Sequence, residues 1–233
     1  MDIWEAWDIM KRTLDYGKAA AVFREQAAKA SFRDAAIVYI IAAVYSAFLA
    51  VVMNVMSLFV VRSVYYFMGI DVPEIELDTP LLAPYALYFF GLIMPLGLVI
   101  TALMQAVTFK ALRLTGGKGN FVKQLYLYSF LALALSVGST LMLSQFFSCL
   151  GLIPLLGYLF FSFYVQFYLQ SVMLRDLHSI STLHAFMGVL IGTAVGVAAY
   201  LLVTSTLAGA GISAPLPEDM LGIAERVGEL NAV

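Results

Sequence analysis

Five long runs of apolar residues dominate the sequence, and none of them contains an aspartate or a glutamate. Each run has at least 20 residues, about the length that an α-helix needs to cross the hydrocarbon core of a bilayer. A segment in lipid must satisfy its own backbone hydrogen bonds, so such runs predict helices. We therefore expect an all-α, polytopic transmembrane bundle with five spans, at about residues 35–61, 85–109, 124–147, 155–174 and 185–207.

Composition supports the same class of protein. The chain is 62% hydrophobic and only 12% charged, whereas soluble domains carry about 25% charged residues. A soluble fold of this length could not bury so much apolar surface, but lipid can surround it. The net charge of −2 gives no reason to expect a nucleic-acid partner, so membrane lipids are the first expected partners.

Basic residues predict the direction of the spans. Segment 1–34 carries six lysines or arginines, segment 110–123 carries four and segment 175–184 carries one, which together are eleven of thirteen. In a five-span chain these three segments lie on the same side of the membrane. The positive-inside rule then places them, and the N-terminus, in the cytoplasm. The C-terminus is expected outside.

The first segment, residues 1–34, is expected to be amphipathic, because Ile3, Trp7, Met10 and Leu14 recur at helical spacing. A basic helix with tryptophan on one side suits the headgroup layer of a membrane. The alternative is an ordinary soluble helix that lies on the cytoplasmic face of the bundle. The expected basic and interfacial residues are Trp4, Trp7, Lys11, Arg12, Lys118 and Lys123.

The domain between residues 35 and 209 is expected to hold all five spans. Its acidic segment 69–84 is predicted to be an external loop, and Gly151, Pro154 and Gly157 predict a tight apolar turn between spans three and four. Cys149, the single cysteine, is expected to be a small buried apolar residue. Residues 210–233 form a polar tail.

Small residues recur along the fifth span. Glycines spaced four apart let two helices approach closely in lipid. This pattern indicates a packing face, either within the bundle or between two copies in a homo-oligomer. Its members are Ala185, Gly188, Gly192, Gly196 and Ala199.

Four glutamines lie inside the expected spans beyond the first residue of a span, and buried amides in a membrane bond across helices or line a path for a substrate. They are Gln105, Gln145, Gln166 and Gln170. Either a polar groove or a set of interhelical hydrogen bonds is consistent with them. The two histidines, His178 and His184, flank the link before span five, and with Asp176 they make only a weak metal signal.

No pattern of catalytic residues occurs in the spans. We therefore expect no enzyme activity, no catalytic residue, no cofactor and no metal site. The absence of carboxylates from the spans also argues against a proton or ion relay.

Three short motifs follow one another in the second half of the chain: Gly-Gly-Lys-Gly at 116–119, Gly-Leu-Ile-Pro-Leu-Leu-Gly at 151–157, and Leu-Arg-Asp-Leu-His-Ser-Ile-Ser at 174–181. In their order and spacing they resemble the Yip domain of the Ypt/Rab-interacting membrane proteins. The segment from Trp7 to Leu14 is similar to the start of prokaryotic members. The resemblance implies a five-helix bundle with a cytoplasmic N-terminus and, in eukaryotic relatives, a link to small GTPases and vesicle traffic.

The chain departs from the eukaryotic relatives, because it has neither their long N-terminal region nor their Asp-Leu-Tyr-Gly-Pro motif. It resembles a prokaryotic member, which implies a multi-pass protein of the cell membrane. The leading hypothesis is a non-enzymatic scaffold or binding protein that takes part in membrane organisation, with lipids or a protein partner at its cytoplasmic face. The alternative is a transporter, or the membrane subunit of one.

Overall fold

The computed structural model describes residues 1–69, 79–146 and 152–212, with side chains except at 79–81, 143–146 and 152. Every regular element in this part is a helix. Five segments are long and apolar enough to cross a membrane: Phe32–Phe67, Leu82–Leu114, Phe121–Met142, Ile153–His178 and Thr182–Gly209. These confirm the all-α, five-span prediction, while the cytoplasmic N-terminus stays a prediction.

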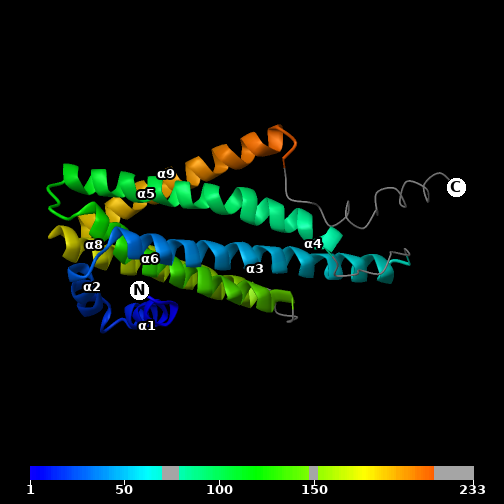
Figure 1. The fold of residues 1–233 in the computed structure, drawn as a ribbon, viewed down its shortest axis with the longest axis horizontal. Coiled ribbons are helices and arrows are strands. Elements are labelled where there is room, and N and C mark those ends of the chain that lie inside the picture. The colour runs from blue at the N-terminus through cyan, green and yellow to red at the C-terminus, as the bar shows by residue number, and fades with distance from the viewer. Residues whose placement is uncertain (70–78, 147–151, 213–233) are drawn as a thin grey trace.

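Two short helices, α1 (Ile3–Leu14) and α2 (Ala19–Ala28), precede the spans. Helix α1 begins at Asp2, whose carboxylate accepts a hydrogen bond from the Glu5 amide at 2.7 Å. Helix α1 packs against α6, and α2 packs against α8. Both therefore belong to the folded bundle (Figure 1).

The first span is a single helix, α3 (Phe32–Phe67). Ser31 caps it, since its hydroxyl accepts from the Asp34 amide at 3.5 Å. At 36 residues, it rises about 54 Å, well beyond the ~30 Å of a hydrocarbon core.

The second span departs from regular α-geometry. It consists of α4 (Thr79–Ala86), the π-helical segment η1 (Leu87–Ile93) and α5 (Met94–Leu114). Pro95 is the second residue of α5 and supplies no backbone donor to the preceding turn. A π-turn shifts the hydrogen-bonding partner, and the turn before this proline is such a π-segment.

Spans three and four are also divided. Span three is α6 (Phe121–Gly138) followed by the 3₁₀ segment η2 (Ser139–Phe146). Span four is α7 (Leu152–Phe163), the π-segment η3 (Tyr164–Leu169) and α8 (Gln170–His178). The predicted turn around Gly151 and the single Cys149 fall in residues 147–151, outside the described residues.

The fifth span is one helix, α9 (Thr182–Gly209), which packs along α5, while α3 packs along α6. Helix α6 has ten buried residues, with a continuous buried stretch from Gln124 to Leu131. The N-terminus, the α5–α6 turn and the α8–α9 turn lie at one end of the bundle (Figure 1). We call this end, made of residues 1–34, 110–123 and 175–184, the basic end.

Candidate functional site

The fold gathers the three basic segments of the sequence at the basic end (Figure 1). Together they hold eleven basic and seven acidic side chains. Opposite charges neutralise part of this set: Arg12 pairs with Glu25 at 2.8 Å, and Lys18 pairs with Asp15 at 2.8 Å. Lys11 lies 3.8 Å from Asp8.

Two predicted cations of this end make no ion pair within the described part of the chain. Lys118 and Lys123 are both exposed. Lys123 also lines a small hollow of about 150 Å³ with Arg24 and Asp176. Their charge is thus available to a partner outside the bundle.

Helix α1 has one buried face and one exposed face. Ile9 and Met10 are buried in the main core. Trp4 and Trp7 point away from that core, with 77% and 38% of their surfaces exposed. Helical spacing places Lys11 on the tryptophan side. The structure therefore sets two tryptophans and a lysine on the outside of a helix that is fixed on its other side.

Polar contacts hold α1 and α2 in place. The Tyr126 hydroxyl donates to the Gln26 side chain at 3.1 Å, and the Tyr164 hydroxyl donates to the Leu14 carbonyl at 3.2 Å. The Met1 amine pairs with Asp34 at 3.1 Å. Because these contacts reach three different helices of the bundle, the N-terminal segment is docked along its length.

His178 is fully buried near the basic end and joins three parts of the chain. Its Nδ1 accepts from the Gly119 amide at 3.2 Å, and its Nε2 lies 3.1 Å from the Gln124 side-chain oxygen. Gln124 in turn donates to the Gln105 side chain at 3.1 Å. Sequence reasoning placed His178 beside the link and missed this role, because the partners come from α5, α6 and their turn.

Two glycines of the Gly-Gly-Lys-Gly turn lie so close to the His178 ring that no side chain fits at their positions. A Cβ on Gly117 would lie 2.9 Å from the imidazole Nδ1, and one on Gly119 would lie 2.8 Å from the ring carbons. Any larger residue would displace the ring. The Lys118 amide also donates to the His178 carbonyl at 3.1 Å, so the α5–α6 turn is fastened to the end of α8.

The predicted glutamines do not line a common groove in the described structure. Gln105 bonds to Gln124, whereas Gln166 accepts from Tyr128 at 3.0 Å and donates to Thr193 at 3.2 Å. Gln170 is buried, and its amide has no partner among the described residues. The side chain of Gln145 is outside them. The observed amide contacts are thus hydrogen bonds between helices.

The small-residue face of α9 lies against α5. A Cβ on Gly188 would come within 2.5 Å of Leu112, and one on Gly192 would overlap Thr108. Gly196 faces Met104 at 3.3 Å, and Ala185 is fully buried. Ala199 lies beyond this contact and is half-buried. Of the two interpretations of the stripe, the structure shows contact within the bundle.

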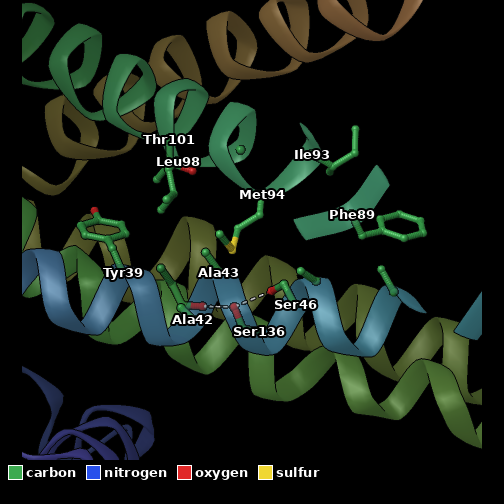
Figure 2. A pocket seen from close by; sticks show the side chains of 14 residues that line it. Tyr39, Ala42, Ala43, Ser46, Phe89, Ile93, Met94, Leu98, Thr101 and Ser136 are labelled. Carbon is green, nitrogen blue, oxygen red and sulfur yellow. Dashed lines mark hydrogen bonds between the residues drawn. The ribbon is translucent and has the colours of Figure 1, made fainter. Parts of the chain in front are cut away.

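A groove separates α3 from α5 over part of their length (Figure 2). It has a volume of about 270 Å³. Met94 and Leu98 extend from α5 toward Ala42 and Ala43 of α3, and Tyr39 stands at one end (Figure 2). We call this space the α3–α5 groove. Sequence reasoning gave no sign of it, although alanine and glycine make up six of its fourteen lining residues.

The two histidines of the weak metal signal lie in different surroundings. The described residues contain no cluster of three or more histidine, cysteine, aspartate or glutamate side chains that could hold a metal ion. His178 is buried, whereas His184 is exposed and lies 2.8 Å from the Ser181 hydroxyl. The two histidines thus have separate surroundings and separate partners.

Comparison with known proteins gives no relative from which a role could be transferred. No protein-family model, no curated protein and no solved structure matches the chain.

Proposed function

We propose that this chain is a non-enzymatic integral membrane scaffold of the Yip-like type, and that its basic end binds the headgroups of anionic lipids. One observation carries the proposal: Trp4 and Trp7 are exposed on a docked helix at the end of the bundle where Lys118 and Lys123 are unpaired. A role in organising the membrane follows from binding lipids at a fixed site.

Each part of this end suits the headgroup layer. Tryptophan rings favour the boundary between lipid and water, because they combine an apolar body with a polar N–H. Each lysine or arginine near an anionic surface contributes about 1 kcal/mol. Since Ile9 and Met10 hold α1 on the bundle, the tryptophans need no further ordering to reach the membrane surface.

Two of the glutamines that suggested the transport alternative bond to neighbouring helices. The Gln105 side-chain oxygen accepts from Gln124, and Gln166 donates to Thr193. The α3–α5 groove opens to the side of the bundle and is lined mainly by apolar residues. A path for a polar substrate would need the reverse arrangement, with polar groups facing an enclosed channel.

Energy transfer from tryptophan tests the proposal directly, because Trp4 and Trp7 are the only tryptophans in the chain. The full-length protein is placed in nanodiscs of phosphatidylcholine with a small fraction of dansyl-labelled lipid. The label is carried either by phosphatidylglycerol or by phosphatidylcholine. We expect transfer to the anionic lipid to exceed transfer to the neutral one, and the excess to fall as salt is added.

A charge variant gives the control. Replacing Lys118 and Lys123 by glutamine should lower the local enrichment of the anionic lipid several-fold. Replacing Lys11 and Lys18, which face acidic partners, should have a smaller effect. Equal transfer to both labelled lipids in the wild-type protein would rule out the proposal.

A further inference from the structure

A small hollow at the basic end brings together charged side chains from three helices. Arg24 comes from α2, Lys123 from α6 and Asp176 from α8, and all three line the same space of about 150 Å³. Helix α2 packs against both α6 and α8 at this end of the bundle (Figure 1). We call this space the α2–α8 hollow.

The two cations of the hollow keep hydrogen-bond donors that no described residue uses. Arg24 donates its Nε–H to the Ala20 carbonyl at 3.2 Å, and the two terminal nitrogens of its guanidinium have no partner in the described part of the chain. Lys123 is exposed and makes no ion pair there. Donors of this kind suit the oxygens of a phosphate group.

The Asp176 carboxylate faces the same hollow and has one oxygen in use. Its Oδ1 accepts from the Arg175 Nε at 2.7 Å, and 19% of the side-chain surface is exposed. Among the described residues, neither Arg24 nor Lys123 pairs with it. Opposite charges therefore line one small space without meeting each other. A ligand that carries both signs of charge can fill the gap between them.

The remaining lining and the volume limit what fits. Phe23, Leu127 and Met173 line the hollow and are buried in the main core. Charges beside such an apolar wall interact more strongly than charges in open water. A space of about 150 Å³ admits a group of roughly the size of benzene. A phosphate with a two-carbon arm is of this size, whereas a peptide segment is much larger.

From this geometry we propose that the α2–α8 hollow binds the phosphoethanolamine headgroup of a membrane lipid. The phosphate oxygens accept hydrogen bonds from Arg24 and Lys123, and the primary ammonium donates to the second oxygen of Asp176. Lys123 stands in the first turn of α6 and Asp176 in the last turn of α8, where candidate spans begin and end. The inference rests on the proposed function, because it needs the basic end to lie in the headgroup layer.

Asp176 distinguishes this headgroup from the others. A headgroup that is anionic overall would leave the carboxylate without a counter-charge. Phosphatidylcholine has the same phosphate and the same positive charge, but its nitrogen carries no hydrogen. A primary ammonium has three N–H donors, as in lysine. We therefore expect the hollow to select lipids by the number of N–H groups that they present to Asp176.

A methylation series of lipids tests this selection on the wild-type protein. The full-length protein in detergent micelles is given phosphatidylethanolamine, its N-methyl or N,N-dimethyl derivative, or phosphatidylcholine, all with the same acyl chains, and native mass spectrometry measures the retained lipid. We expect retention to fall with each methyl group and to be about tenfold weaker for phosphatidylcholine than for phosphatidylethanolamine. Equal retention of the four lipids would overturn the proposal.

Two variants at one ion pair separate binding from structure. Asp176→Asn should lower the retention of phosphatidylethanolamine to that of phosphatidylcholine, which should not change. Arg175→Gln breaks the same ion pair but keeps the carboxylate, so the preference for phosphatidylethanolamine should persist. If Arg175→Gln removes the preference as fully as Asp176→Asn, the carboxylate acts only through its ion pair and the proposal is wrong.

A second pair of variants tests the phosphate contact. Arg24→Gln should lower the retention of all four lipids by the same factor, about fivefold. Arg33→Gln is the matched control, since Arg33 is exposed and does not line the hollow, and it should leave retention unchanged. Equal losses in the two variants would mean that the cations act only by general attraction, contrary to the proposal.

Soluble glycerophosphoethanolamine identifies the source of the headgroup. It has no acyl chains, so it should displace the lipid only at far higher concentration. Displacement at an equal concentration would make the ligand a free phosphoethanolamine compound and overturn the assignment to a lipid. Because all four lipids of the series have the same net charge, failure of the series leaves the expected transfer from tryptophan to anionic lipid unaffected. The two proposals can therefore fail separately.

Discussion

The contact between α5 and α9 gives the sharpest stability prediction. At Gly192, an added Cβ would overlap the Thr108 hydroxyl and lie 2.9 Å from the Met104 carbonyl oxygen. Thr108 could turn away only by giving up its own 2.9 Å hydrogen bond to that carbonyl. The carbonyl belongs to the backbone of α5, so it can move only if the two helices separate.

The net cost of Gly192→Ala follows from three contributions. Overpacking a tight contact costs about 1–3 kcal/mol, and the lost hydrogen bond costs about 1 kcal/mol. Alanine regains about 1 kcal/mol through its higher helix propensity. The variant should therefore lose about 2 kcal/mol, which is a factor of roughly 30 in the ratio of folded to unfolded protein.

A series of glycines on α9 provides the controls for reversible unfolding in mixed micelles. Gly196→Ala should be nearly neutral, because its nearest neighbour would be Met104 at 3.3 Å. Gly209→Ala meets no atom within 4 Å and should not destabilise. Adding Thr108→Ala to Gly192→Ala should recover about 1 kcal/mol of coupling energy.

Two results would refute this reasoning. If Gly192→Ala is no less stable than Gly209→Ala, the two helices are not in close contact at this position. If Gly192→Leu instead stays folded and only dissociates a wild-type dimer, the glycine face serves association between copies.

Two further predictions concern the basic end. His178→Ala should cost about 3 kcal/mol in chemical unfolding, because it leaves Gln124 and a backbone amide unpaired around a cavity, whereas His184→Ala on the exposed surface should cost less than about 0.5 kcal/mol. The Arg12 guanidinium lowers the pKa of Glu25 below its ordinary value of 4.5; the ion pair between α1 and α2 is therefore kept above that pH and lost as the pH falls through the lowered pKa. Tryptophan fluorescence should report this loss in acid, and Glu25→Gln should abolish the pH dependence.

The features that sequence could predict are those determined locally. Apolar runs without carboxylates give five helices, because lipid leaves the backbone few alternatives. A serine before a helix is a common cap, and the Ser31 hydroxyl caps the first span. The grouping of the basic segments follows from the order of the crossings, since two spans separate each basic segment from the next.

The features that sequence could not predict depend on which helices become neighbours. His178 is buried because the glycine turn before α6 folds over its ring. The residues next to His178 in the sequence do not predict this contact with the turn. Gln105 finds Gln124 rather than another of the predicted amides. The α3–α5 groove arises where the alanines of α3 lie opposite larger side chains of η1 and α5. The sequence of an apolar run does not indicate which residues its alanines will face.

The fifth span is held along only part of its length. All of its buried residues lie between Ala185 and Gly196, which leaves thirteen residues, from Val197 to Gly209, to extend alone for about 20 Å. A helix that is held at one end passes a tilt at its held end on to its free end. A tilt of about 10° at the glycine contact would move the far tip of α9 by about 3 Å. Small changes in the packing of α9 against α5 would therefore be largest, as displacements, at Gly209.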